Sequence, residues 1–377
     1  MESIRPIIPF PRLVYTSRVL KLSDFDYSLP EGAIAQTPAQ PRDSSKLLVL
    51  DRQTGAIKHA HFSDLPQFLR AGDVLVRNNS KVIKARLFGE KTSGGKVEVL
   101  LNTEVRHDEQ SVTWECLTKP GLKAGQQLTF KNSLKAECVD PGKVGYTRLL
   151  RFNCPPHLFF ETIEKIGQVP LPPYITSKTN QTTLAKQYQT TYAQTQGSVA
   201  APTAGLHFTA ELDQQLRAIG VQIAEVTLHV GLGTFLPVKT ENITQHSMHE
   251  EWFSLSQKTT ELLNQAKVEG RRIIAVGTTT TRVLESVLAK NKNFKATTGS
   301  TNILIYPPYQ FKAIDGLITN FHLPKSTLLM LVSAFVCQPN TKQVFVSFEK
   351  TNTGQAYLKA LENNYRFFSF GDGMLII

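Results

Sequence analysis

The chain has few features of a zinc-binding, secreted or membrane protein. Its four cysteines are widely spaced and form no Cys-x-x-Cys pair, so we expect no structural zinc but small buried thiols in a reducing cytosol. The longest apolar runs, such as residues 328–336, fall short of the ~20 residues that span a bilayer, and no secretory signal is evident. We therefore expect a cytoplasmic protein without a membrane partner.

Acidic residues are also fewer than basic ones. The chain has 42 Lys and Arg against 31 Asp and Glu, which gives a formal net charge of +11. A basic balance favours a polyanionic partner, with nucleic acid first, although many basic proteins bind none. Because no run of five or more Lys and Arg occurs, any positive surface must be assembled by the fold.

The sequence pattern changes along the 377 residues, a length sufficient for two domains. Residues 1–19 are interrupted by prolines and are predicted to form an N-terminal extension. Residues 73–154 alternate short β-branched runs with Gly and Pro turns, which predicts an inserted all-β barrel. Helical and strand patterns alternate in residues 20–72 and 155–377 and predict one α/β catalytic domain built from both chain ends. The expected fold class is thus mixed α/β and α+β.

Three predicted strand-to-helix loops contain candidate ligand-binding residues. Residues 197–209 pass through a Pro, Thr and Gly loop to His207, residues 229–235 contain two glycines, and residues 276–282 place Gly277 and four threonines at a helix start. Open α/β sheets bind ligands at such loops, and helix N-termini favour anions. No Lys-Ser/Thr pair follows Gly277, so a carboxylate or a single phosphate is more plausible than a nucleoside triphosphate. Threonines that only cap the helix are the alternative.

Histidines are the other candidates, because histidine carries protons near neutral pH. Five of the nine lie in or beside predicted strand-to-helix loops: His207, His229, His246, His249 and His322. His246 and His249 could form a metal site, but their spacing does not fit the HExxH motif or its inverse. Acid–base use of His249 and Glu251 is the better interpretation, although a lone histidine is more often structural.

These segments together resemble the S-adenosylmethionine:tRNA ribosyltransferase-isomerase family of queuosine biosynthesis. The resemblance runs from Leu-Ser-Asp-Phe-Asp-Tyr at residues 22–27 to residues 365–372. Its most specific blocks are residues 198–209, 228–235, 246–251, 277–285 and 316–331. The chain departs from the usual pattern at Ser80, Lys81, Lys84, Leu236, Pro308, Lys325 and Gly373.

The resemblance implies a reaction. The ribosyl part of S-adenosylmethionine would be transferred and isomerised onto 7-aminomethyl-7-deazaguanine at the tRNA wobble position, giving epoxyqueuosine-tRNA, adenine and methionine. The sulfonium acidifies the C5′ hydrogens, so a base can remove one. The resemblance implies no metal and no prosthetic group, S-adenosylmethionine as co-substrate, the tRNA anticodon arm as partner, and a monomer. The alternatives are a non-catalytic RNA-binding protein and a metal-dependent hydrolase that uses His246 and His249.

The expected site residues fall into three sets. The catalytic set, expected in one pocket with His207 and His249 as leading acid–base candidates, is His207, His249, Glu251, His229 and His322. The set expected to bind S-adenosylmethionine is Thr203, Ala204, Gly205, Leu206, Gly231, Gly233, Thr234, Gly277, Thr278 and Thr279. The RNA-binding set, with Phe321 or Tyr306 stacking on a base, is Tyr306, Asn320, Phe321, Lys325, Ser326 and Arg366.

Overall fold

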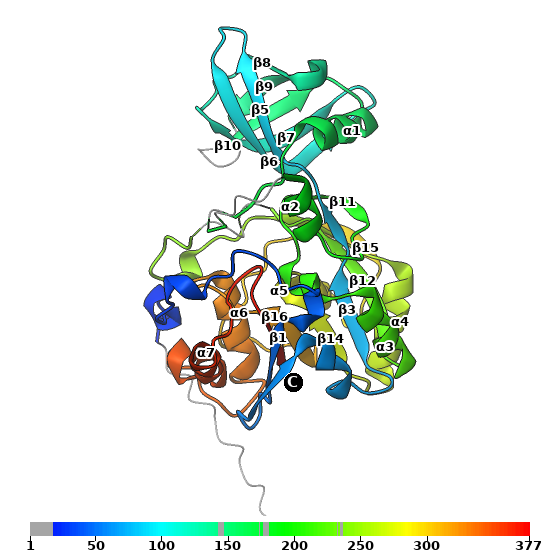
Figure 1. Ribbon diagram of the computed structural model, residues 1–377, viewed down its shortest axis with the longest axis vertical. Coiled ribbons are helices and arrows are strands. Elements are labelled where there is room, and N and C mark those ends of the chain that lie inside the picture. The colour runs from blue at the N-terminus through cyan, green and yellow to red at the C-terminus, as the bar shows by residue number, and fades with distance from the viewer. Residues whose placement is uncertain (1–17, 142–146, 173, 176–180, 232, 234–236) are drawn as a thin grey trace, which may run out of the picture.

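The computed structural model describes residues 18–141, 147–172, 174–175, 181–231, 233 and 237–377. Most of the predicted N-terminal extension, together with Thr234 and Leu236, lies outside these residues. Figure 1 shows two bodies, a large one in which helices surround a sheet and a small barrel above it. The predicted fold class is confirmed.

The large body contains, within the described residues, a nine-stranded sheet in the order β15-β13-β12-β3-β14-β16-β17-β1-β2. Its strands are β1 (Lys46–Leu50), β2 (Ile57–His61), β3 (Val74–Asn78), β12 (Gln222–Leu228), β13 (Glu251–Leu255), β14 (Ile273–Val276), β15 (Thr297–Thr301), β16 (Gly316–Asn320) and β17 (Gly373–Ile376). The central strands β12, β3, β14 and β16 are parallel, so their carboxyl ends share one edge. Strands from the two chain ends are neighbours, because β1 pairs with β17 and Leu47 lies opposite Gly373.

Helices cover the sheet, whose central strands are apolar on both faces. The α-helices are α1 (Pro156–Ile166), α2 (Gln181–Gln187), α3 (Ala210–Ala218), α4 (Gln257–Val268), α5 (Gly277–Lys290), α6 (Thr327–Val336) and α7 (Asn352–Glu362). Short 3₁₀ helices lie between the other elements: η1 (Leu22–Phe25), η2 (Glu31–Ala33), η3 (Arg42–Ser44), η4 (Phe62–Gln67), η5 (Lys131–Ser133), η6 (Thr203–His207), η8 (Ile243–Gln245) and η9 (Phe348–Lys350). Thr209, Ser256 and Ser326 each accept a backbone N–H at a helix start, which stabilises α3, α4 and α6.

The small body is a closed barrel in the order β10-β7-β6-β5-β8-β9. Its strands are β5 (Arg86–Lys91), β6 (Lys96–His107), β7 (Val112–Lys119), β8 (Gln127–Phe130), β9 (Lys135–Pro141) and β10 (Thr147–Phe152). Trp114, Phe152 and Phe159 fill its core. Below the barrel, β4 (Ser80–Val82) pairs in parallel with β11 (Thr195–Ser198).

The predicted limits of the inserted domain do not match this topology. Residues 73–78 were assigned to the barrel, but β3 is a fully buried central strand of the large sheet. Helix α1 was assigned to the α/β domain, but its residues Phe159 and Ile163 belong to the barrel core. A β-branched run predicts a strand and an amphipathic pattern predicts a helix, but neither predicts which other elements it packs against. We propose that the insert extends from β5 to the end of α1.

A buried ionic network joins β3 to its neighbours. Arg77 is 4 % exposed, and its Nη1 and Nη2 lie 2.6 Å from Asp213 and 3.1 Å from Glu225. Its guanidinium also lies 3.7 Å from the ring centroid of Tyr192. The central strand, α3 and β12 are thus connected through one cation.

We expect Arg77→Ala to lower the free energy of unfolding by about 3–5 kcal/mol, because it leaves two carboxylates without their buried partner. Urea denaturation followed by circular dichroism measures the change. The control is Arg86→Ala, which removes the exposed barrel pair between Arg86 and Glu98 and should cost about 1 kcal/mol or less. Equal losses in the two variants would contradict the role of the network.

Candidate active site

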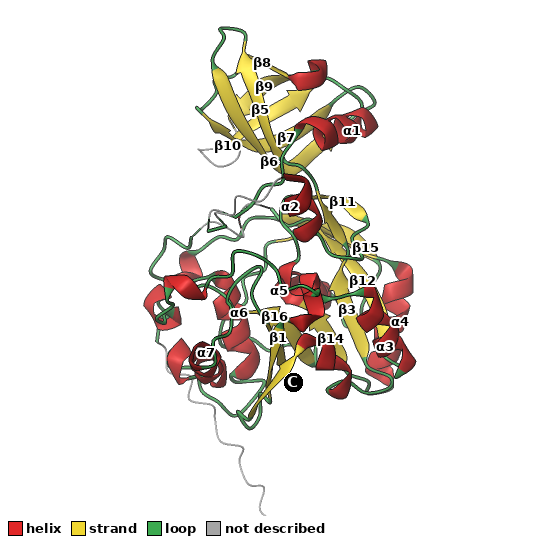
Figure 2. Ribbon diagram, in the orientation of Figure 1, coloured by secondary structure: helices red, strands yellow, loops and turns green. Residues whose placement is uncertain are grey.

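A hollow lies at the carboxyl ends of β14 and β16. Its lining comes from η6, the first turn of α5, the end of β16 and the segment at residues 368–369. In Figure 2 the loops drawn in green converge near α5 and β16. Among the residues expected in the site, those that line this hollow are Thr203, Ala204, Gly277, Thr278, Thr279, Asn320 and His322.

The N-terminus of α5 forms one wall of the hollow. Gly277 has φ +87°, a conformation that favours glycine, and the N-cap residue Val276 makes no side-chain cap. Thr280 and Thr281 donate to the carbonyls of Val276 and Gly277, at 2.7 and 3.1 Å, instead of capping N–H groups. The backbone N–H groups beside Thr278 can therefore bind an anion.

The lining has no formal charge. Among the described residues that line the hollow there is no Lys, Arg, Asp or Glu, only hydroxyls, one amide, one imidazole and apolar groups. The side chains of this lining therefore do not neutralise the charge of a bound ligand. Because the effective dielectric constant inside a protein is below that of water, hydrogen bonds and the helix N-terminus act more strongly on a ligand here than they would in water.

His322 is the imidazole of the hollow. Its Nε2 lies 2.8 Å from the Thr319 hydroxyl, its backbone N–H donates to the Tyr357 hydroxyl at 2.9 Å, and its carbonyl accepts from Tyr27 at 2.5 Å. Burial lowers the pKa of His322 to about 3. The ring is therefore neutral at physiological pH and held in one orientation.

His207 lies next to the hollow but does not line it. Its Nδ1 is 2.8 Å from the Ser45 hydroxyl and its Nε2 is 3.2 Å from the Asn320 amide nitrogen, while its ring stacks on Phe62 at 4.7 Å. Burial, with smaller contributions from Arg366 and Arg42, lowers its pKa to about 3. His207 thus fixes Asn320, which does line the hollow.

The other expected acid–base residues lie elsewhere, so the prediction of one shared pocket is wrong. Glu251 is buried in an ion pair with Arg282, and its Oε1 accepts the Gly231 N–H at 3.1 Å. His249 packs against Gly233, where a Cβ would lie 2.5 Å from its ring. His229 faces a different hollow, and burial lowers its pKa to about 4. The position of these residues at strand ends does not determine the direction in which each side chain points.

The expected S-adenosylmethionine set is also divided. Gly205, Leu206, Gly231 and Gly233 do not line the hollow, and Thr234 lies outside the described residues. A Cβ on Gly205 would lie 2.0 Å from the Tyr192 hydroxyl, so this glycine serves packing. Two further residues of the lining, Tyr174 and Ser369, were not expected from the sequence; their hydroxyls are 2.6 Å apart. Ser369 falls within the last block of the resemblance, which was the available signal.

The expected RNA-binding residues are mostly engaged within the protein. Phe321 is 0 % exposed among aromatic core residues, so its predicted stacking on a base is wrong. Ser326 caps α6, and Tyr306 packs half-buried against the core. Lys325 pairs with Asp26 at 2.8 Å, and Arg366 pairs with Asp372 at 3.4 Å.

Within the described residues, no group of three or more His, Cys, Asp or Glu side chains is placed to hold a metal ion. Burial lowers the pKa of His246, with a smaller contribution from its neighbour His249. No helix in the described part of the chain is long and apolar enough to cross a membrane.

The fold is that of an α/β protein with an uncharged hollow at its parallel strand ends, the edge at which proteins of this class bind ligands. The chain belongs to the family described as queuosine biosynthesis protein, whose model matches residues 22–376. The resemblance inferred from the sequence is thereby confirmed.

Relatives and a crystal structure cover almost the whole chain. Proteins named S-adenosylmethionine:tRNA ribosyltransferase-isomerase from Carboxydothermus hydrogenoformans and Desulfitobacterium hafniense are 52% and 50% identical, over 95% of this chain and 100% of each relative. The crystal structure of S-adenosylmethionine tRNA ribosyltransferase from Thermotoga maritima is 38% identical, with a TM-score of 0.52, over 94% of this chain and 100% of that one.

We expect His207→Gln to weaken the dependence of stability on pH. The folded pKa of His207, about 3, lies below its ordinary value of 6.5, so between these values only the unfolded chain binds the proton. The free energy of unfolding therefore falls as pH falls below about 6.5, by ~1.4 kcal/mol per pH unit for each such histidine. Urea denaturation at pH 6 and pH 5 should show a fall about 1 kcal/mol smaller in the variant. An unchanged fall would mean that His207 is not buried as a neutral ring.

Proposed function

We propose that this chain transfers and isomerises the ribosyl part of S-adenosylmethionine onto 7-aminomethyl-7-deazaguanine at the tRNA wobble position. The products are epoxyqueuosine-tRNA, adenine and methionine. Family membership and the names of relatives identical at about half of all positions support this function. The structural observation that carries it is the uncharged hollow beside the free N-terminus of α5.

The two ends of a sulfonium amino acid suit this hollow. Its carboxylate can accept hydrogen bonds from the backbone N–H groups at the start of α5, next to Thr278 and Thr279. Its sulfonium would then lie among hydroxyl and apolar groups with no described carboxylate in the lining to offset it. An uncompensated positive charge increases the acidity of the adjacent C5′ hydrogens.

His322 is the best-placed base. Burial lowers its pKa, so the ring is neutral at physiological pH and offers an unprotonated nitrogen. The same shift makes it a weak base, so the proton that it removes must be an acidic one, such as a C5′ hydrogen beside the sulfonium. The same burial makes the resulting imidazolium unfavourable, which favours passing the proton to the departing adenine. The bond between Nε2 and the Thr319 hydroxyl orients the ring, and the bond from the His322 backbone N–H to Tyr357 fixes the backbone beneath it.

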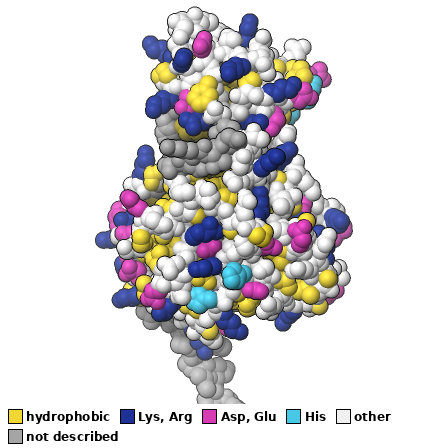
Figure 3. Space-filling model, in the orientation of Figure 1, with side chains coloured by type: hydrophobic (Ala, Val, Ile, Leu, Met, Phe, Trp, Pro, Cys, Tyr) yellow, Lys and Arg dark blue, Asp and Glu magenta, His cyan; other side chains and the backbone are white. Residues whose placement is uncertain are grey.

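A basic hollow at the base of the barrel offers phosphate contacts. It includes Lys81 and Lys186, together with two cations that already have partners within the protein. Lys84 pairs with Glu164 at 3.1 Å, and Arg42 donates to three backbone carbonyls. Figure 3 shows Lys and Arg on the visible face of the barrel and near the junction of the two bodies. We infer that this surface binds the backbone of the anticodon arm, and that the protein acts as a monomer in the cytoplasm, where tRNA is modified. Lys325 and Arg366, which are already paired, are secondary candidates.

The decisive experiment measures adenine release from S-adenosylmethionine in the presence of tRNA carrying the wobble deazaguanine, with and without a chelator. We expect release that the chelator does not reduce. A protein that only binds RNA would release no adenine, and a metal-dependent hydrolase would lose activity with the metal.

We expect His322→Gln to slow adenine release by about 10²–10⁴-fold, because a general base is lost, while S-adenosylmethionine still binds. His207→Gln is the matched comparison, since His207 is equally buried and has a similarly lowered pKa but does not line the hollow. Single-turnover kinetics and calorimetric titration separate the two steps. A larger loss with His207→Gln than with His322→Gln would restore His207 as the leading base.

We expect Lys81→Ala to weaken tRNA binding and to reduce by about one the slope of log affinity against log salt concentration. Lys325→Ala is the comparison, because Asp26 already neutralises that cation. Filter binding across a salt series gives both slopes. If only the Lys325 variant changes its slope, the anticodon arm lies over α6 instead of the basic hollow.

A further inference from the structure

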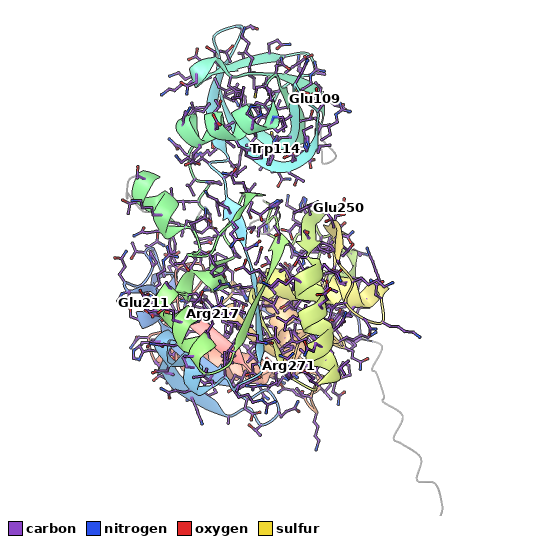
Figure 4. All side chains as sticks on the ribbon, turned by 90° about the vertical axis from the view of Figure 1, so that its right-hand side faces the viewer. Glu109, Trp114, Glu211, Arg217, Glu250 and Arg271 are labelled. Carbon is purple, nitrogen blue, oxygen red and sulfur yellow. The ribbon has the colours of Figure 1, made fainter. Side chains whose placement is uncertain are left out.

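A second hollow lies where the barrel meets the α/β domain. Glu104 and Trp114 enter it from β6 and β7 of the barrel. Gln196, His229 and Trp252 enter it from β11, the end of β12 and β13. Figure 4 shows Trp114 in the part of the barrel nearer to the α/β domain. The reaction steps assigned above do not use this hollow.

Its walls are aromatic. Both tryptophans of the chain, Trp114 and Trp252, line it. The Trp252 ring stacks on the His229 imidazole, with centroids 4.8 Å apart and planes at 17°, and Trp252 is 36 % exposed. Proteins bind unstacked single bases on such flat aromatic surfaces.

Polar atoms accompany the aromatic rings. Nδ1 of His229 and Nε1 of Trp114 are buried and have no hydrogen-bond partner among the described residues. Buried polar atoms are nearly always paired, so these two nitrogens point to a bound polar group. Gly197 leaves the space that the His229 ring needs, since a Cβ there would lie 2.6 Å from its Nε2.

Glu104 supplies a carboxylate acceptor, whose Oε1 lies 2.5 Å from Nδ1 of His107, another residue of the lining. Glu104 lies opposite Trp114 in the β6–β7 ladder, and that ladder shifts register on both sides of it, between residues 101 and 103 and between residues 104 and 106. Such bulges re-aim side chains next to binding sites. A carboxylate accepts adjacent N–H donors, and a guanine-type base has two of them, N1–H and its amino group, on its Watson–Crick edge. Adenine lacks that pair of donors.

The two hollows are neighbours. Ala200 and Val230 line the first hollow, and Gly197 and His229 line the second. The Val199 N–H donates to the Val230 carbonyl at 2.9 Å, which joins the two segments between the hollows. Ligands bound in both would meet across this pair of segments.

We propose that the second hollow binds the deazaguanine base of the tRNA after it leaves the anticodon stack, while S-adenosylmethionine occupies the first. This inference rests on the proposed function. The His229–Trp252 pair stacks on the base, Glu104 accepts its N1–H and amino group, and its 7-aminomethyl group reaches toward the ribose in the first hollow. Recognition of the base thus requires both the barrel and the α/β domain.

Tryptophan fluorescence tests the site directly, because the half-exposed Trp252 lies in it and Trp114 borders it from the barrel core. Free 7-aminomethyl-7-deazaguanine should quench the emission saturably, and 7-deazaadenine should do so at least ~10-fold more weakly, since it lacks the paired donors. Equal quenching by the two bases would overturn the proposal.

Glu104→Gln and its matched control Glu98→Gln test the acceptor. Both residues lie on β6, with side chains 30% and 31% exposed. Glu104 pairs with His107 and Glu98 pairs with Arg86, and each variant removes one negative charge. We expect Glu104→Gln to raise the KM for tRNA by ~10–100-fold with an unchanged KM for S-adenosylmethionine, and Glu98→Gln to match the wild type. A rise in the KM for S-adenosylmethionine instead would assign the hollow to adenine and overturn the proposal.

Failure of the proposed function is distinguishable from failure of this inference. A wild-type protein that releases no adenine with modified tRNA refutes the function, whereas the fluorescence titration of the free bases still decides what the hollow binds.

Discussion

The structure depends on pairing buried polar groups at the carboxyl edge of the parallel strands. Asn78, at the end of β3, is 0 % exposed and satisfies three backbone groups, accepting from Ser80 and Leu228 and donating to the Leu228 carbonyl at 3.0 Å. Its amide also lies 3.4 Å from the Thr279 hydroxyl. Buried polar groups are costly unless they are paired, so these bonds hold the loops of the site in one arrangement.

The same constraint separates the histidines into different roles. His207 bridges Ser45 and Asn320, which brings the start of β1 and the end of β16 together. His322, similarly buried, faces the hollow and keeps its ring in position through Thr319. Both rings are neutral because burial lowers their pKa, yet only one of them can reach a ligand. Burial therefore sets the protonation state of a histidine, and the direction of its side chain sets its use.

The insertion of the barrel places a second surface beside this edge. Strands β1 and β17 come from opposite ends of the chain and pair side by side in the large sheet. The barrel therefore interrupts the chain without breaking the sheet. Gly231 marks the contact between the two bodies, because a Cβ there would lie 3.1 Å from the Asn102 side chain of β6. A reaction that joins a small sulfonium compound to a tRNA base needs two adjoining sites, and the junction is where we propose the second.

The sequence by itself determined the composition class, the barrel, the α/β alternation and the family, because turn residues, periodicity and motif blocks are local properties. It also located the α5 N-terminus and the residues Thr203 and His322. Only the tertiary structure decided that β3 belongs to the large sheet and that Glu251 is bound to Arg282. Only the tertiary structure showed that Phe321 lies in the core and that His229 faces the barrel. These outcomes depend on which residues distant in sequence meet, and a local pattern does not contain that information.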